Sequence, residues 1–487
     1  AFNKIIGITI SLENVFLLIM SLGPCCVNSG CALKTEKFSA SIDQPLIDWV
    51  NLEKKQNYQI STMDISRLEW WKSFEDPDLV NLIEQGLASN YDIAQATNRI
   101  RQAQEKLNSV RVNKNPSVDA KINSSKATSS EESGLGRTSS LISTQFQTSW
   151  EIDLFGKFKR DTDAAEANVQ LEVASMNGIK VKVISTIVES YITFRATTEE
   201  IKLNQEAADY LREFVKLAEL EAQVGLKSIK EVQTAKIQLS NLETNNTEQE
   251  TRIDETLLAI DLILGANPGT TSNKIAHSKT ALTLPKEIAI SIPAKTILQR
   301  PDIQEALNGL KIEAAKVGVA EAQRYPTFSL SGSIGLEALA INSLGNSGAN
   351  FSSIQAGLLA PIFNSGALKA NVNAQIANRD VALEIYRKSV ANGLNETEQA
   401  LLNLNSVRER LKTIKPALQF SRNHVELTNS QYAVGLVSFR EVLKSREELN
   451  SLKQKQSSLM FDEFQGITQL YKVLGGGWAY KSDKTNI

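Results

Sequence analysis

Cysteine and histidine, which often supply nucleophiles and metal ligands, are scarce in this 487-residue chain. All the cysteines, Cys25, Cys26 and Cys31, lie before residue 32, and the only histidines are His277 and His424. The body of the chain therefore has no thiol chemistry and no Cys/His cluster that could bind a metal ion. An isolated histidine is more often a surface or core residue than a ligand. We expect neither a metal site nor a cofactor.

No other set of residues points to catalysis. The sequence shows no nucleophile paired with a base. The run Gly475-Gly476-Gly477 falls at the end of a predicted helix rather than after a strand, so it is not a phosphate-binding loop. A net charge of -2 with 22% charged residues is not typical of a nucleic-acid-binding protein. The sequence therefore argues against an enzyme and against a nucleic-acid partner.

The cysteines lie near the end of a segment with the character of a signal peptide, where a cysteine can be lipidated. A basic flank and the largely apolar stretch from Ile5 to Met20 predict that residues 1–30 are this signal. Asn28-Ser29-Gly30-Cys31 resembles a lipoprotein cleavage box, in which a small residue precedes the cysteine that becomes lipidated. We predict lipidation, for example with palmitate, at Cys31, which would anchor the chain without spanning a membrane. Lipidation at Cys25 or Cys26, and a plain secretory signal, are the alternatives.

Residues 70–275 and 276–478 are two copies of one unit, related by a constant offset of 210 positions. Residues 31–69 are expected to form an extended segment before them, and 479–487 a tail. The matches need no insertion or deletion, and clusters that share one shift indicate an internal duplication. They include Pro116 and Pro326, Gly156 and Gly366, Lys159 and Lys369, Val224-Gly225-Leu226 and Val434-Gly435-Leu436, and Leu264-Gly265 and Leu474-Gly475.

Each copy contains two long segments typical of helices. The run 157–223 has no proline and a single glycine, and is rich in good helix formers. A helix of that length would extend roughly 100 Å at 1.5 Å per residue. The short turn after it predicts an antiparallel return helix over 228–264. The second copy should have helices over 367–433 and 438–474, with Pro416 kinking or interrupting the first.

In the segments between the predicted helices, apolar residues recur at every second position. Apolar residues alternate with polar residues over about 327–340 and about 350–363, on either side of a turn rich in Asn, Gly and Ser. The first copy has counterparts over about 117–129 and 140–155. Each pair predicts a hairpin. Strands of this length, with one apolar and one polar face, fit either a transmembrane barrel or an amphipathic hairpin on a soluble core.

Four strands are too few to close a barrel, since the smallest transmembrane barrels have about eight. An open sheet edge is not tolerated in lipid. If the hairpins enter a membrane, several chains must therefore share one barrel.

Short motifs mark fixed places in the two copies. They are Trp70-Trp71-x-x-Phe74-x-Asp76-Pro77, Ser149-Trp150-Glu151-Ile152-Asp153-Leu154-Phe155-Gly156, Arg300-Pro301-Asp302-Ile303, Tyr325-Pro326, Pro361-Ile362-Phe363 and Leu470-Tyr471-Lys472-Val473-Leu474-Gly475-Gly476-Gly477-Trp478. In this order and spacing, the chain from about Trp70 to Trp478 resembles the outer membrane factors of Gram-negative tripartite efflux systems, of the TolC-like, NodT-type lipoprotein lineage.

The resemblance implies a mainly α fold with a membrane β-barrel. Each chain of a homotrimer would give four strands to one twelve-stranded barrel and its long helices to a periplasmic tunnel, with a mixed α/β collar around the middle. The implied function is that of a lipid-anchored outer membrane channel projecting into the periplasm, a passive exit duct for small solutes. The implied partners are outer membrane lipid, a periplasmic adaptor (membrane fusion) protein and an inner membrane efflux pump of the resistance-nodulation-division type.

The resemblance also assigns functional residues. The turns Val224-Gly225-Leu226-x-Ser228 and Val434-Gly435-Leu436-x-Ser438 match the family's periplasmic tips, where an adaptor docks, and glycine lets a backbone reverse and a partner approach. Arg440, Glu441 and Lys444 fall at the closed end of the tunnel. Family members often carry an aliphatic residue and a carboxylate in place of Arg440 and Lys444. Three copies of a cation around one axis repel one another unless paired, so we predict an ion-paired constriction.

Simpler interpretations stay open. The two tips could be structural hairpin turns only, and Arg440 and Lys444 could be solvated charges on the outer face of the helices. A periplasmic coiled-coil scaffold or adaptor without a barrel is the competing function. It would use the same long helices but would not need alternating hairpins at equivalent places in both copies.

Overall fold

The computed structural model describes residues 49–50, 58–60, 69–134, 136–225, 228–275, 282–285, 288–290 and 297–479. The predicted signal peptide, Cys25, Cys26 and Cys31, the tip residue Leu226 and residues 480–487 lie outside the described part of the chain.

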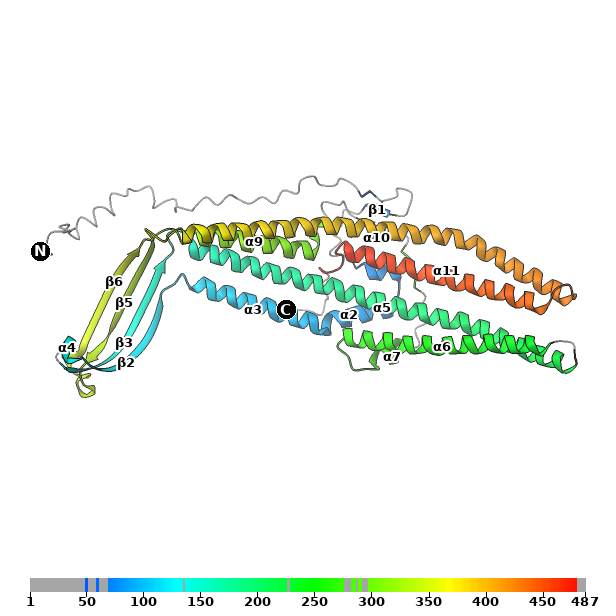
Figure 1. Cartoon of the computed structure of the whole chain (residues 1–487), viewed down its shortest axis with the longest axis horizontal. Helices are drawn as coiled ribbons and strands as arrows, with labels where there is room; N and C mark the ends of the chain where they lie inside the picture. The colour runs from blue at the N-terminus through cyan, green and yellow to red at the C-terminus, as the bar shows by residue number, and fades with distance from the viewer. Residues whose placement is uncertain are drawn as a thin grey trace. The chain divides into compact units, whose positions relative to one another are not determined.

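Helices and strands of the second copy begin and end 210 residues after those of the first (Figure 1). The matched elements are α3 (Tyr91–Val112) and α9 (Pro301–Ala322), β2 (Ser117–Thr128) and β5 (Thr327–Ala338), α5 (Lys157–Gln223) and α10 (Ala367–Ala433), and α6 (Ile229–Ile263) and α11 (Phe439–Val473). The remaining strands of the hairpins, β3 (Thr138–Ile152) and β6 (Asn350–Leu359), differ in length. The two halves of the chain therefore fold as repeats, as the offset predicts.

The proline inside α10 does not end the helix. Pro416 is exposed, and α10 runs through it to Ala433, so of the two predicted outcomes the interruption is wrong, and a kink stays a prediction. A proline removes one backbone donor. Ile414 and Leu418 on either side of it are buried, and this packing holds the helix together across the missing hydrogen bond. In the described residues, no helix combines the length and the apolar character needed to cross a bilayer.

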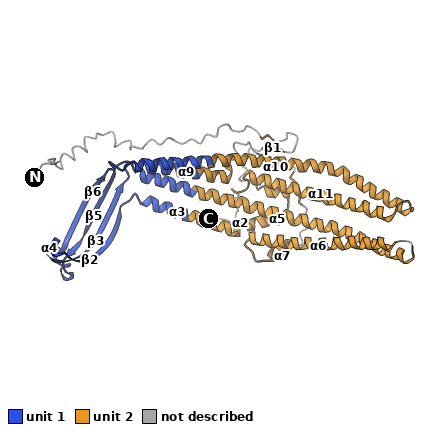
Figure 2. Ribbon diagram, in the orientation of Figure 1, with its two compact units in different colours: residues 1–41, 102–169, 308–384 blue, residues 42–101, 170–307, 385–487 orange. Residues whose placement is uncertain are grey.

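The chain divides into two compact units that cut across the repeats (Figure 2). The sheet unit contains Gln102–Val169 and Asn308–Glu384. The helix unit contains Ile42–Arg101, Gln170–Leu307 and Ile385–Ile487. Each unit thus combines corresponding segments of both copies.

The sheet unit holds a four-stranded antiparallel sheet in the order β2-β3-β5-β6. Residues that face one another across strands share a face of the sheet. One row is Ala120, Phe146, Ile334 and Ser352, and another, on the same face, joins Ile152, Phe328 and Leu358. The opposite face carries Asp119, Gln147, Ser333 and Ser353. The alternation in the sequence therefore predicts the two faces correctly, and β2 and β6 are the edges.

Side chains at the ends of the strands tie the sheet to the helices of its unit. The rings of Phe155 and Tyr325 stack with centroids 4.8 Å apart. The Trp150 Nε1–H donates to the carbonyl oxygen of Lys114 at 2.8 Å. Ala103, Leu107 and Val169 form a small buried cluster between α3 and α5. Small residues there let the two helices lie close together.

The helix unit is built around the tryptophan motif. Trp70–Phe74 forms the short helix η3, and the buried carboxylate of Asp76 caps α2 (Pro77–Ser89) by accepting from Asp78 N at 2.9 Å. The other Asp76 oxygen accepts from the Tyr191 hydroxyl at 2.7 Å. The Trp70 ring stacks on Tyr471 at 5.3 Å, so the start of the first copy packs on the end of the second.

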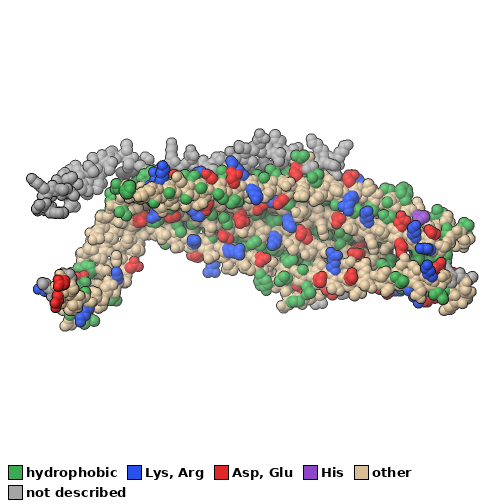
Figure 3. Space-filling model, viewed as in Figure 1, with side chains coloured by type: hydrophobic (Ala, Val, Ile, Leu, Met, Phe, Trp, Pro, Cys, Tyr) green, Lys and Arg blue, Asp and Glu red, His purple; other side chains and the backbone are tan. Residues whose placement is uncertain are grey.

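Shorter elements complete the structure. The strands β1 (Tyr58–Ile60) and β4 (Ile288–Ile290) pair in parallel in the helix unit. The remaining short helices are α4 (Glu131–Gly134), α7 (Thr270–Ile275), η4 (Ile341–Ser343) and η5 (Ser347–Ala349). Positive and negative side chains are interspersed over the helices, whereas the strands show few charges on the side seen in Figure 3.

Candidate functional site

The first tip joins α5 to α6. Gly225 has φ = 77°, in the left-handed region where a side chain would be strained, and its N–H donates to Ala222 O at 3.1 Å. The Ser228 hydroxyl then accepts from Lys230 N at 3.2 Å and caps the first turn of α6. Backbone reversal and helix capping explain why a glycine and a serine occur at this spacing.

The second tip joins α10 to α11 with nearly the same backbone. Gly435 has φ = 76°, and its N–H donates to Tyr432 O at 2.9 Å. Ser438 precedes α11 without a side-chain capping bond. Val434 and Leu436 are 70% and 74% exposed, and Val224 of the first tip is 70% exposed. Both tips therefore present apolar side chains to their surroundings, and a docking role for them stays a prediction.

An apolar cluster next to the tips, here called the tip cluster, joins the two helical hairpins. Phe214 of α5 stacks on Phe439 of α11 with the ring planes 3° apart. The buried members come from α5, α6 and α11: Leu211, Phe214, Val215, Ala218, Val232, Ala235, Phe439, Val442 and Leu443. The helical spacing of the α5 residues predicts a buried stripe, but the sequence gives no sign that its partner is the other copy.

The predicted constriction residues lie on the opposite side of α11 from the tip cluster. Arg440, Glu441 and Lys444 are exposed, whereas Phe439, Val442 and Leu443 are buried. None of the three charged side chains forms an ion pair with a described residue of the same chain. The expected pairing of Arg440 with Glu441 is thus not made within one chain. Their role in a constriction stays a prediction.

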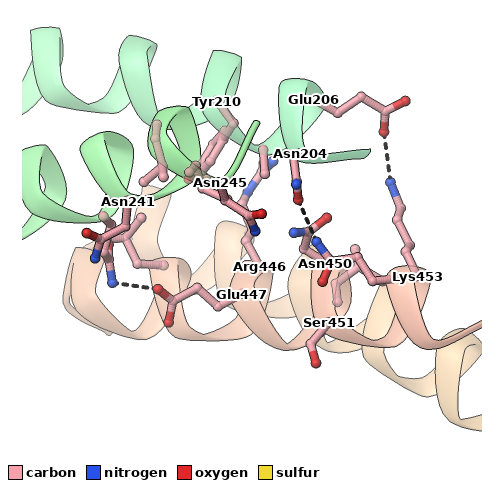
Figure 4. A pocket seen from close by; sticks show the side chains of 17 residues that line it. Asn204, Glu206, Tyr210, Asn241, Asn245, Arg446, Glu447, Asn450, Ser451 and Lys453 are labelled. Atoms are coloured by element: carbon pink, nitrogen blue, oxygen red, sulfur yellow. Dashed lines mark hydrogen bonds and ion pairs between the residues drawn. The ribbon is translucent and has the colours of Figure 1, made fainter. Parts of the chain in front are cut away.

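A polar cavity follows the tip cluster along the same helices (Figure 4). It has a volume of about 430 Å³ and is lined by α5, α6 and α11. The Asn204 side chain is fully buried; its Oδ1 accepts from Gln454 Nε2 at 2.6 Å. Arg446 lies 3.6 Å above the Tyr210 ring, and Lys453 pairs with Glu206 at 3.2 Å. Sequence reasoning missed this cavity, because α11, which completes its walls, is distant in the chain from α5 and α6.

Among the residues that the structure describes, no three His, Cys, Asp or Glu side chains are placed to hold a metal ion together.

The fold defines the class of the protein. A four-stranded antiparallel sheet with one apolar face, combined with two antiparallel pairs of helices of 67 and 35 residues, is the architecture of a TolC-like outer membrane channel. The solved structure of the outer membrane channel OprN superposes with a TM-score of 0.83 at 25% identity, covering 91% of this chain and 98% of that one. The Campylobacter jejuni CmeC channel has the same fold, with a TM-score of 0.80 at 23% identity over 93% and 96% of the two chains.

The chain belongs to the outer membrane efflux protein family, whose pattern matches residues 82–266 and again 292–476. Each match falls within one copy of the repeat. The chain is therefore an outer membrane component of an efflux system and serves as its exit duct.

Two curated relatives cover most of the chain. Nodulation protein T of Rhizobium leguminosarum bv. trifolii is 28% identical over 421 residues, which are 85% of this chain and 88% of the relative. The toluene efflux pump outer membrane protein TtgI of Pseudomonas putida is 25% identical over 409 residues, 83% of this chain and 87% of the relative.

Proposed function

We propose that three copies of this chain form one channel, with a shared twelve-stranded β-barrel in the outer membrane, a helical tunnel in the periplasm and a mixed α/β collar around it. The observation that carries this proposal is the sheet of the sheet unit. Its edge strands β2 and β6 are long, with 12 and 10 residues, and neither has an outer partner in the described chain. In lipid, unpaired backbone groups at such edges are too costly, so each β2 needs the β6 of a neighbouring copy.

The faces of the sheet support the same arrangement. In the proposed barrel the apolar face, with Phe146, Ile334 and Ile354, lies against lipid. These side chains are 61%, 64% and 85% exposed in the single chain, which is a large apolar surface to leave in water. The polar face, with Ser333, Ser353 and Gln147, lines the lumen and gives solutes a wet passage.

Disulfide trapping between edge strands tests the trimer. Cysteines replace Asp119, Lys121 or Asn123 on β2, one at a time, together with Ser353→Cys on β6. Because a disulfide forms only when the Cα atoms lie about 4.4–6.8 Å apart, one of these pairs should crosslink into a covalent trimer. The matched control moves the second cysteine to Ser333 on the inner strand β5, and a chain without engineered cysteines controls for the native ones. Covalent dimers without trimers, or release of the protein from membranes by salt alone, would contradict the proposal.

The closed end of the tunnel is proposed to include Arg440, Glu441 and Lys444. Their exposure beside the tip cluster leaves them available to meet the same residues of other copies around an axis, where Glu441 would offset part of the repulsion between cations. Single-channel recordings of Arg440→Ala and Lys444→Ala should show a changed conductance of the closed state. Lys230→Ala is the matched control, because Lys230 occupies the place of Arg440 in the first copy. Unchanged closed-state conductance in both variants would remove this assignment.

The tips are proposed to dock a periplasmic adaptor that connects the duct to an inner membrane pump of the resistance-nodulation-division type. The exposed Val224, Val434 and Leu436 would supply the apolar contact. Photo-crosslinking amino acids at Val224 and Val434 should capture the adaptor in cells, whereas one at Ile341, an exposed apolar residue of the sheet unit, should not. Equal capture from all three positions would contradict tip docking.

The chain is also proposed to be held in the outer membrane by acylation of Cys31. One relative, the probable outer membrane lipoprotein SilC of Salmonella typhimurium, carries that description in its name and is 23% identical over 84% of this chain. Metabolic labelling with palmitate should mark the wild type and the Cys25→Ser variant but not Cys31→Ser. If Cys25→Ser loses the label and Cys31→Ser keeps it, the acylated residue is Cys25 rather than Cys31.

A further inference from the structure

We propose that the cavity between α5, α6 and α11 is a binding site for a small amphipathic monocarboxylate, held by Arg446 and Asn204. The proposal concerns one chain and is independent of the trimer. It rests on polar atoms that the fold buries without partners, on an arginine that forms no ion pair with a described residue and on a comparison of the two copies of the repeat.

Unsatisfied donors line the cavity. Asn204 is fully buried, and its Nδ2 has no hydrogen-bond partner although its Oδ1 is engaged by Gln454. The Nε of Arg446 is also buried without a partner. Burying a donor without a partner is costly, so each of these N–H groups needs an acceptor that the protein does not supply. A ligand oxygen in the cavity would satisfy both.

The second copy shows that the fold itself does not require polar residues here. The position of Asn204 is taken by Ile414 in the second copy, and that of Thr197, two helical turns earlier, by Val407. Ile414 lies in a buried apolar cluster with Leu411 and Leu459, against which Val407 packs. Apolar side chains therefore occupy the equivalent positions of α10. The amide at position 204 is a feature of the first copy that a long helix at this place does not require.

The cavity contains an arginine that can bind a carboxylate. Lys453 is paired with Glu206, and Glu447 accepts a hydrogen bond from the neutral Gln238, so the two carboxylates and the two cations of the lining balance in net charge. Arg446 forms no ion pair with a described residue and lies over the face of Tyr210. A guanidinium in this position keeps its N–H groups free for an incoming carboxylate, which it binds with charge-assisted hydrogen bonds.

The rest of the lining and the volume set the size and character of the ligand. The aliphatic side chains Leu211, Leu242, Leu443 and Leu449 contribute to the wall. A volume of about 430 Å³ lies within the range of roughly 300–1,000 Å³ typical of sites for small molecules. A carboxylate with a short aryl or alkyl chain fits this combination of an arginine, an amide and leucines.

Calorimetry with a matched pair of probes tests the site. 4-Phenylbutyrate and its neutral analogue 4-phenylbutyramide are titrated into the full chain in lipid nanodiscs, and empty nanodiscs give the heat of partitioning into lipid. We expect saturable binding of the acid and much weaker binding of the amide. Arg446→Gln should raise the Kd of the acid about tenfold or more, since it removes a charge-assisted contact. Arg422→Gln, which changes an exposed arginine of α10 outside the cavity, should leave the Kd unchanged.

Asn204→Ile provides a second variant that should fold, because isoleucine occupies the equivalent place in the second copy. It should weaken binding of the acid and retain the helical circular dichroism signal of the wild type. The proposal is overturned by an absence of saturable binding, which would mean that the cavity holds only water. Equal affinities for acid and amide, or equal affinities in Arg446→Gln and Arg422→Gln, would overturn it as well.

Discussion

The side chain of Arg300 donates a hydrogen bond to the carbonyl oxygen of Val473, the last residue of α11, at 2.7 Å. In the first copy the equivalent pair is Asn90 and Ile263, where Asn90 Nδ2 donates to the last carbonyl of α6 at 2.8 Å. Both ends of this contact are shifted by 210 residues. The two copies therefore end their return helices in the same way, with a side chain from the residue directly before α3 in the first copy and before α9 in the second.

In the second copy, the side chain that caps the return helix is charged and forms ion pairs. Arg300 is buried and pairs with Asp302 at 2.8 Å and with Glu396 at 2.6 Å. Burial lowers the pKa of the guanidinium, but hydrogen bonds and attraction from Asp302 and Glu396 outweigh it, so its pKa is raised above its usual value. We expect Arg300→Met to lower the free energy of unfolding by about 1.5–3 kcal/mol, as hydrogen bonds to a charged group are lost. Asn90→Ala should cost about 1 kcal/mol. Denaturant unfolding of the two variants compares them, and a larger effect in Asn90→Ala would contradict the role of charge.

Replacing the proline inside α10 should stabilise the protein. Pro416→Ala restores a backbone donor and the best helix former at an exposed position, and we expect a gain of about 1–3 kcal/mol in the free energy of unfolding. Lys415→Ala, at the exposed neighbouring position, should change it by no more than about 0.5 kcal/mol. Chemical denaturation gives both values. A loss of stability in Pro416→Ala would show that the helix depends on the proline.

A methyl group at Gly335 should disrupt the sheet. A Cβ there would overlap the Thr144 carbonyl oxygen and lie 2.7 Å from the Cα of Gln145, so β3 and β5 could not keep their pairing. We expect Gly335→Ala to reduce the amount of heat-resistant oligomer in the outer membrane severalfold on gels. Gly345→Ala, in the turn between β5 and β6 where a Cβ meets nothing within 4 Å, is the control and should assemble normally. Normal assembly of both would contradict the tight approach of the strands.

Truncating the stacked ring at the tip cluster should loosen the junction of the helical hairpins. Phe439→Ala removes a buried aromatic side chain, and we expect it to lower the free energy of unfolding by about 3–5 kcal/mol. The closed state of the proposed channel should also conduct more. Phe420→Ala removes a ring that is 71% exposed and should change neither property. Equal effects of the two substitutions would mean that the Phe214–Phe439 contact is not specific.

Glu305 should make stability depend on pH. Burial, followed by repulsion from Glu172 and Asp302, raises the pKa of Glu305 above the usual 4.5. The folded protein then binds a proton that the unfolded chain does not, so its stability rises as pH falls through the raised pKa towards 4.5. Thermal unfolding between neutral pH and pH 4.5 should show this gain in the wild type and less of it in Glu305→Gln. Glu313→Gln, which removes the carboxylate that pairs with Lys316 on the same helix, should keep the wild-type profile.

The sequence predicts the local structure of this chain well, because local rules produce it. The run over 157–223, which has no proline, and the run over 367–433, which has only Pro416, form helices with those bounds, and period-two alternation marks the strands. Pro416 shows the limit of such rules, since burial of Ile414 and Leu418 outweighs the loss of one hydrogen bond.

The contacts between copies were not predictable in the same way. Phe214 meets Phe439, and Asn204 meets Gln454, across more than 200 residues, and no periodicity within one helix reveals a partner that distant. The parallel pair of β1 and β4 was missed for the same reason, because each strand has only three residues. The charged residues at 440, 441 and 444 are assigned to a constriction by resemblance to the family, and their role stays a prediction because the neighbours that would define it belong to other copies of the proposed trimer.

The presence of two copies of the repeat in one chain affects how many chains the proposed assembly needs. A chain with a single copy would contribute two strands and one helical hairpin, and six such chains would have to meet to supply the same elements. Covalent linkage of two copies replaces half of those encounters with intramolecular ones, at an effective concentration on the order of millimolar for short connections. It also removes the requirement that all six positions of the proposed ring be identical. A site such as the proposed one at Asn204 would then occur three times in that ring rather than six.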